Sequence, residues 1–332
     1  MMATARHLFV PLTVMVLLLA FPLATTGFYL EFTSKVMILA IFALSLELLV
    51  GATGLVSLGH AAFYGIAAYA TVLLTPKFAA ASAFWLLPAA VACAALYALL
   101  VGALSLRTRG VYFIMVTLAF AQMAYYVFHD TKLGGGTDGI YLNFKPEVAV
   151  FGLKLFDVAK PVALYYVVLV SLVLVFLFLA TLLKSRFGRV LAGIKSNEQR
   201  MRAAGFATFP YKLAAFTLAG ALAGLAGFLV AVKDGYVNPE MLSWHESGAV
   251  LLMLILGGMG RLSGAVLGAF AFALLQLFFQ WDVVFGNFAK HWPLMLGGTI
   301  ILCVAFMPNG LIGLPAQWRA RRARKTTEEA RA

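Results

Sequence analysis

Charged residues are scarce in this chain of 332 residues, because Asp, Glu, Lys and Arg together make up only 11% of it. A soluble domain carries roughly 25% charged residues and about half apolar ones. Here the apolar share is 63%. So few charges cannot cover a water-facing surface of ordinary size. The composition therefore excludes a soluble globular domain as the main part of the molecule.

Cysteine and the common catalytic motifs are also missing or rare. Cys93 and Cys303 both lie inside apolar runs, as packed small side chains do, which argues against a disulfide, redox pair or metal site. We find no Gly-x-x-x-x-Gly-Lys-Ser/Thr phosphate loop and no His-Glu-x-x-His, Cys-x-x-Cys or Gly-x-Ser-x-Gly pattern. We therefore expect a protein that is not an enzyme, does not hydrolyse ATP itself and binds no cofactor or metal.

Long apolar runs recur along the whole chain, and a run of about 18 to 20 residues is enough to cross a bilayer. Such runs form helices, because lipid offers no partners for exposed backbone groups. We count about ten candidate spans: 8–29, 34–52, 57–75, 84–105, 110–129, 161–183, 212–232, 246–260, 263–280 and 290–308. The runs at 246–260 and 263–280 are joined tightly enough to be one broken helix or a re-entrant pair. The sequence thus predicts an all-α, polytopic transmembrane helical bundle with eight to ten spans.

The positive charge is concentrated on one side of these spans. Of the 25 Lys and Arg residues, 17 fall at Arg6, 106–110, 184–212, Arg261 and the tail 319–332, together with three acids. The opposite side holds the remaining eight with nine acids. Because cytoplasmic loops carry the excess of Lys and Arg, we assign this side and both termini to the cytoplasm. The net charge of +12 then reflects topology and contact with anionic lipid, not nucleic-acid binding.

The first run has a second interpretation. Arg6, an apolar stretch and small residues near Ala24 also form the pattern of a cleaved signal peptide, although the apolar core is longer than a secretory one. Either interpretation leaves the next residues outside. We describe residues 1–318 as one transmembrane domain followed by a basic cytoplasmic tail, 319–332.

Two hydrophilic segments interrupt the spans: an external loop at 130–160 and a basic cytoplasmic segment at 184–211. In the second, Ser196 to Gln199 fits a capping box, Glu198 suits the first turn of a helix, and Gly205 fits the position just after its end. We predict a helix of about eight residues there. It is either a solvated or lipid-surface connector or a docking site for a cytoplasmic partner.

Small and polar residues inside the spans are the remaining features. Glycines spaced by four, at 220–224 and 260–268, favour close helix packing, and 257–260 can break a helix to line a cavity. Glu47 is the clear carboxylate within a span, and Ser57, His60, Thr117 and Gln122 are milder polar residues. A charge inside a membrane is a functional hypothesis by default, but Glu47 is as well explained by a structural pairing.

Several ordered motifs resemble one known family. They are Gly54 to Tyr69 (GLVSLGHAAFYGIAAY), Arg107 to Phe113 with Thr117 to Phe120, Gly188 to Lys212, Gly257 to Ala269, and Pro308 to Leu311. This series is similar to the permease subunit of branched-chain amino acid ABC importers, in its LivM-like branch, over residues 35–315. Lys195, where Arg is usual, and Ala265, where Pro is common, depart from the pattern.

The resemblance implies an importer built from two related permeases, two cytoplasmic ATPases that bind ATP and Mg, and an external soluble binding protein. ATPase closure would push on residues 188–205 and drive alternating access. The residues implied in ATPase coupling are Gly188, Arg189, Asn197, Glu198, Arg200, Ala204, Gly205 and Lys212. The candidate translocation path comprises Glu47, Ser57, His60, Tyr64, Thr117 and Gln122.

The sequence allows more than one substrate and more than one energy source. Branched-chain or other hydrophobic amino acids are the first expectation, and urea, amides or aromatic acids are the alternatives that the resemblance allows. A proton-coupled secondary transporter that uses Glu47 is the rival of another class. Uptake driven by ATP or by a proton gradient distinguishes the two.

Overall fold

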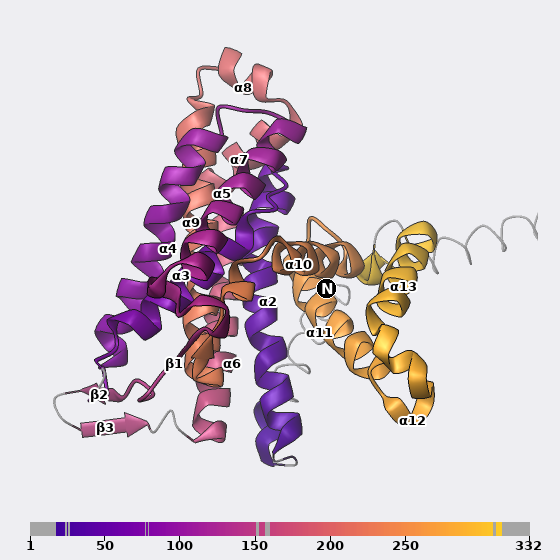
Figure 1. Cartoon of the computed structure of the whole chain (residues 1–332). Helices are drawn as coiled ribbons and strands as arrows, with labels where there is room; N and C mark the ends of the chain where they lie inside the picture. Colours follow the sequence, from indigo (N-terminus) through magenta and orange to yellow (C-terminus); the bar gives the residue numbers. More distant parts are fainter. Residues whose placement is uncertain are drawn as a thin grey trace, which may run out of the picture.

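The computed structural model describes residues 18–23, 25, 27–76, 78, 80–150, 153–156, 160–307 and 310–313. Helices dominate this part of the chain (Figure 1). The α-helices are α2 (Phe28–Thr53), α3 (His60–Leu74), α4 (Ala83–Ser105), α5 (Val111–Asp130), α6 (Pro161–Lys184), α7 (Arg186–Ser196), α8 (Glu198–Ala203), α9 (Thr208–Asp234), α10 (Trp244–Gly257), α11 (Leu262–Phe279), α12 (Asp282–Phe285) and α13 (Trp292–Phe306). The prediction of an all-α membrane bundle is confirmed.

Helix α2 lies at the centre of the bundle. It packs against α6 and α9 on one side and α10 and α11 on the other, so that in Figure 1 it stands between the two groups of helices. Its most apolar stretch of 18 residues is 89% buried, against 22% for α5. Helices buried on all sides form the core, while those with one bare apolar face are suited to contact lipid. Helix α9, at 72%, is the second core helix.

Seven helical segments of the described chain are long and apolar enough to cross a membrane. They are α2, α4, α5, α6, α9, α11 and a last segment, Asp282–Gly313. In this last segment the 3-10 turn η4 (Gly286–His291) joins α12 to α13, and a second 3-10 turn, η5 (Leu311–Gly313), follows α13. The predicted spans match these segments closely. The first predicted span, 8–29, lies largely outside the described residues, as do the tail at 319–332 and Pro308 with Asn309.

Helices α3 and α10 are too short for a full crossing. With 15 and 14 residues they rise about 22 Å, less than the roughly 30 Å of a hydrocarbon core. The span predicted at 57–75 is therefore corrected, because residues 54–59 are not helical although Ser57 is completely buried. Irregular backbone is tolerated at such depth where protein surrounds it. Ser247 of α10 supports it, as its Oγ accepts the N–H of Ala61 at 2.8 Å.

Helices α10 and α11 form a closely packed hairpin. The helix break predicted at 257–260 is present, since α10 ends at Gly257 and both Gly258 and Gly260 have positive φ. A side chain at Gly268 would lie 2.0 Å from the carbonyl oxygen of Met253, so the two backbones approach as closely as glycine permits. The two predicted segments are thus separate helices joined by a tight turn.

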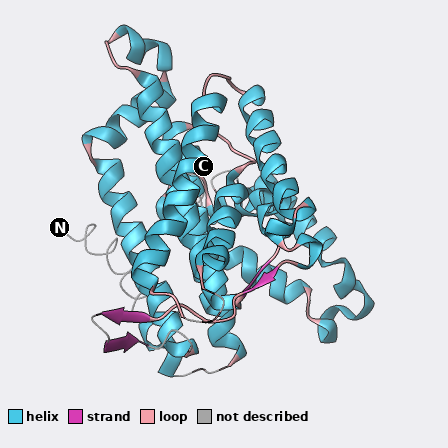
Figure 2. Ribbon diagram, turned by 60° about the vertical axis from the view of Figure 1, so that its left-hand side comes forward, coloured by secondary structure: helices cyan, strands magenta, loops and turns pink. Residues whose placement is uncertain are grey.

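The molecule has two polar ends. At one end lie α7 and α8; at the other lie two small antiparallel pairs, β1 (Ile140–Tyr141) with β4 (Tyr236–Val237), and β2 (Val148–Val150) with β3 (Leu153–Phe156). Figure 2 shows how little of the chain is strand. We call these the α8 end and the strand end. The predicted loops 184–211 and 130–160 thus lie at opposite ends.

Candidate functional site

The α8 end is built on a corner between two short helices. Helix α7 was not predicted from the sequence. Its N-cap residue is Ser185, whose Oγ accepts the N–H of Gly188 at 3.4 Å. Gly193 of α7 leaves room for Met201 of α8, because a Cβ there would lie 2.7 Å from the Met201 sulfur. A larger residue at 193 would require the Met201 side chain to move. The absence of a side chain at Gly193 therefore lets Met201 pack on α7.

The cap of α8 differs from the predicted capping box by one residue. Ser196 is the last residue of α7, and Asn197 takes the N-cap position, where its Oδ1 accepts the N–H of Arg200 at 2.9 Å. An amide oxygen serves this role as well as a hydroxyl does. Gly205 follows the helix with φ +88°, as predicted. The helix has six residues, fewer than the eight expected.

Glu198 holds α8 against the start of α9. Its Oε1 accepts hydrogen bonds from Arg202 Nη2 at 2.6 Å, Thr208 Oγ1 at 2.9 Å and Lys212 Nζ at 2.9 Å. Burial alone would raise the pKa of Glu198, but the donors Lys212, Thr208 and Arg202 outweigh it and lower that pKa to about 2. The carboxylate is therefore ionised at every physiological pH. Bonds to an ionised group are stronger than neutral ones, so α8 is fixed to α9.

We call Glu198, Arg202, Thr208 and Lys212 the Glu198 cluster, and the sequence predicted part of it. Glu198 and Lys212 were predicted as coupling residues, and the structure brings them into contact. Arg202 and Thr208 were missed, although Arg202 follows Glu198 by four residues, a helical ion-pair spacing that could have revealed it. The other predicted coupling residues do not join the cluster. They are Gly188 and Arg189 in α7, Asn197 and Arg200 in the first turn of α8, and Ala204 and Gly205 after it; the side chains of Arg189 and Arg200 are exposed.

A second contact links α7 to the bundle. Lys195 Nζ donates to the carbonyl oxygen of Gly51 at 2.7 Å, in the last turn of α2. Carbonyls in the last turn of a helix lack partners within the helix, and a cation there also suits the helix dipole. Lys195 therefore ties the α8 end to the central helix.

Three of the predicted path residues lie in a closely packed region. Ser57 and His60 are completely buried, and Tyr64 is 6% exposed. Ser45 Oγ of α2 lies 2.6 Å from the carbonyl oxygen of Phe42 and 2.8 Å from His60 Nε2, so α2 and the start of α3 are linked by a buried hydrogen bond. His60 Nδ1 is buried without a partner among the described residues.

Thr117 of α5 lies against the same point, because a Cβ built at Gly59, between Ser57 and His60, would lie 2.2 Å from the Thr117 carbonyl oxygen. The Thr117 hydroxyl bonds to the carbonyl of Ile114 in its own helix at 2.9 Å. Gln122 is partly exposed further along α5, and Glu47, near the C-terminal end of α2, faces the turn between α10 and α11. The structure therefore brings Ser57, His60 and Thr117 together, but not all of the predicted path residues.

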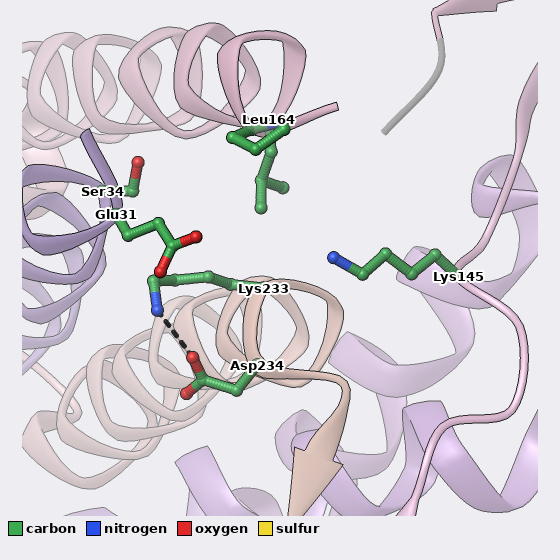
Figure 3. A pocket seen from close by; sticks show the side chains of 7 residues that line it. Glu31, Ser34, Lys145, Leu164, Lys233 and Asp234 are labelled. Atoms are coloured by element: carbon green, nitrogen blue, oxygen red, sulfur yellow. Dashed lines mark hydrogen bonds and ion pairs between the residues drawn. The ribbon is translucent and has the colours of Figure 1, made fainter. Parts of the chain in front are cut away.

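The strand end carries a cleft of about 290 Å³ between α2, α6, α9 and the loop before β2 (Figure 3). It is lined by Glu31, Ser34, Lys145, Pro161, Leu164, Lys233 and Asp234. Lys233 pairs with Asp234 at 2.6 Å. Glu31 and Lys145 point into the cleft from opposite sides and make no ion pair with another described residue. The cleft thus offers one free charge of each sign.

Comparison with known proteins gives a consistent result. Residues 28–305 match the family model described as "Branched-chain amino acid transport system / permease component". The chain is 31% identical to the high-affinity branched-chain amino acid transport system permease protein LivM of Escherichia coli strain K12, and 30% identical to that of Salmonella typhimurium; each alignment covers 93% of this chain and 76% of the relative.

More distant relatives differ in their cargo. The xylose transport system permease protein XylH of Escherichia coli strain K12 is 28% identical over 40% of this chain and 34% of its own length. No solved structure is matched. The family model covers most of the chain, and the LivM alignments extend over nearly all of it. The chain therefore belongs to the family of permease components of branched-chain amino acid transport systems.

Proposed function

We propose that this protein is the membrane-spanning subunit of an ABC importer that moves branched-chain or other hydrophobic amino acids into the cytoplasm by alternating access. The observation that carries the proposal is the Glu198 cluster. A helix of six residues has no stability of its own in water, because a helix shorter than about 12 residues is marginal even when its sequence favours helix. The Glu198 carboxylate nevertheless binds α8 to α9, because it accepts hydrogen bonds from Thr208 and Lys212 of α9. That arrangement suits a segment that must transmit force.

The force would come from other subunits. Two cytoplasmic ATPases, which bind ATP and Mg, would close on residues 188–205 and shift α9 through Glu198. To switch the permease from one state to the other, the ATPases must make more favourable contacts with the second state than with the first, and their closure would supply these contacts. A second related permease would complete the path through the bacterial inner membrane.

An external binding protein would deliver the substrate at the strand end. The cleft there supports this idea, because Glu31 and Lys145 present opposite free charges and Leu164 adds an apolar wall. An amino acid likewise carries one positive and one negative group beside an apolar side chain. LivM relatives point to branched-chain substrates, whereas XylH is a xylose permease, so urea, amides or aromatic acids remain the alternative cargo.

The main test is Glu198→Gln in the complex reconstituted in proteoliposomes with its ATPases and binding protein. The amide keeps the shape but loses the charge that attracts Lys212 and Arg202. We expect uptake to fall about tenfold or more while ATP hydrolysis continues, since one hydrogen bond to a charge contributes about 1.5–3 kcal/mol. Asp282→Asn, a neutralisation at an exposed site in α12, is the matched control and should leave uptake unchanged. Normal uptake in the Glu198→Gln complex would contradict the proposal.

A proton-coupled transporter is the second candidate, favoured by the buried Glu47, whose Oε2 has no partner among the described residues. Vesicles separate the two functions, because uptake that follows a proton gradient and ignores ATP would end the ABC proposal. Reporter fusions at 145 and 195 add a test of topology. They should report opposite sides of the membrane, and agreement between them would contradict the proposed orientation.

A further inference from the structure

Glu47 occupies a place prepared for its carboxylate near the end of α2. The side chain is 3% exposed. Gly51, one turn later, has no side chain, and a Cβ built there would lie 2.1 Å from Glu47 Oε1. Any larger residue at 51 would displace the carboxylate. The carboxylate therefore lies over the same residue whose carbonyl accepts the bond from Lys195.

The partners of Glu47 belong to the turn between α10 and α11. The backbone N–H groups of Gly260 and Arg261 are the hydrogen-bond donors that face its carboxylate, although Oε2 itself has no partner of ordinary geometry among the described residues. Arg261 is the N-cap residue of α11, and its own side chain does not cap the helix. The Glu47 carboxylate thus faces the residues just before α11, where a negative charge is favourable for the helix dipole.

The turn that Glu47 faces is firmly held. A Cβ at Gly310 would lie 2.4 Å from the backbone nitrogen of Gly258, and one at Gly264 would lie 2.4 Å from the Gly258 carbonyl oxygen. Together with the contact of Gly268 on Met253, these close approaches leave the hairpin little room to bend within itself. Displacement of the turn would therefore move α10 and α11 as a unit.

Lys195 connects this region to the α8 end. Besides its bond to Gly51, its ammonium group attracts the Glu47 carboxylate. Lys195 stands two residues before Asn197, the cap of α8. Beside its apolar packing on the bundle, the α7–α8 corner thus has polar contacts through Glu198 to α9 and through Lys195 to α2.

We propose that Glu47 is a positioning residue for transport: it holds the start of α11 against the end of α2 that Lys195 grips, so that α7, α2 and the α10–α11 hairpin shift together. Glu47 is then part of the drive and not a group that touches the substrate. This inference rests on the proposed function, because it needs the α8 end to be the place where force enters.

The test compares Glu47→Gln, Lys195→Met and the double variant in the full complex in proteoliposomes, with uptake and ATP hydrolysis measured together. Each single variant should lower the amount transported per ATP about tenfold, and the double variant should lose little more, because both changes break one link. Lys195→Arg keeps a donor and should retain most of the coupling. Thr53→Val is the matched control, since the Thr53 hydroxyl bonds only within α2, to the carbonyl of Leu49.

Two further results decide between the alternatives. If Glu47→Gln reduces the amount of folded complex, Gly51→Ala takes its place in the test. This variant displaces the Glu47 carboxylate but keeps its charge, and it should lower the amount transported per ATP to the same extent. Losses that multiply in the double variant, or a changed preference among substrates in Glu47→Gln, would overturn the positioning role. If Glu198→Gln uncouples the complex and Glu47→Gln does not, only this inference fails; if wild-type uptake ignores ATP, the proposed function itself fails.

Discussion

The α8 end and the strand end differ in how their charged side chains are paired. At the α8 end, Glu198 satisfies three donors with one oxygen, and Lys212 is 6% exposed. At the strand end, Glu31 and Lys145 face a cleft and make no ion pair with another described residue. Both ends have similar side chains at their disposal. The difference is that the charge of Glu198 is fixed by three donors, whereas the charges of Glu31 and Lys145 stay available in the cleft.

The contrast has a physical consequence. A partly buried cluster in which every member is bonded resists movement, and removing its buried member Lys212 leaves Glu198 with one donor fewer. Solvent-exposed charges interact weakly, are screened by salt, and mainly steer a charged partner. We therefore expect changes at the α8 end to alter coupling and changes at the strand end to alter delivery.

The largest effect is expected for Lys212→Met. It removes a buried donor and leaves Glu198 with two, so uptake should fall about tenfold to a hundredfold while ATP hydrolysis continues, by the cost of a lost bond to a charge. The measurement is uptake and hydrolysis in the same proteoliposomes.

Lys233→Met is the matched control for that change, because Lys233 lies at the opposite end of α9 and also pairs with an acid, Asp234. We expect it to reduce uptake and hydrolysis in proportion, if it acts at all. If Lys212→Met also lowered uptake and ATP hydrolysis by the same factor, the proposed difference between the two ends would be wrong.

A smaller effect is expected for Lys145→Glu at the strand end. The reversal adds a third acid to the cleft, beside Glu31 and Asp234, so delivery by an external binding protein should weaken severalfold in apparent affinity, most strongly at low salt. The maximal rate should stay within about twofold, because the exposed loop does not carry the helix packing. An effect on the maximal rate that is independent of salt would contradict a steering role.

The smallest effect is expected from pH. Because the pKa of Glu198 is lowered from the usual 4.5 to about 2, its contribution is present above about 4.5 and is lost as pH falls through about 2. Carbon NMR of the labelled side chain, assigned by its loss in Glu198→Gln, should show no titration between pH 8 and 5. A midpoint near 4.5 would mean that the cluster does not form.

The sequence predicted the bundle because apolar length and the positions of Lys and Arg are local properties. It also located the α8 segment, since Gly205 and the acid in the first turn are local signals of helix ends. It placed the cap one residue early, because Ser196 and Asn197 are equally good caps and only the preceding helix α7 decides between them.

The contacts that give Glu47 and Lys195 their roles could not be predicted in this way. Lys195 reaches Gly51 across 144 residues, and Glu47 faces residues 260 and 261, so neither pairing leaves a local pattern. The same holds for residues 57–59, which were predicted as part of a span but are irregular; Ser247 of α10 accepts the N–H of Ala61 just after them, in the first turn of α3. In both cases the structure depends on contacts between residues far apart in the sequence.

The central claim is that ATPases grip the α8 end, and cross-linking tests it most directly. A photo-reactive phenylalanine derivative in place of Arg200, on exposed α8, is compared with the same group in place of Tyr141, which is 70% exposed at the strand end. We expect the ATPase subunit to be captured from position 200 alone, with a yield that changes when ATP is added. Capture from neither position, or equally from both, would contradict the account.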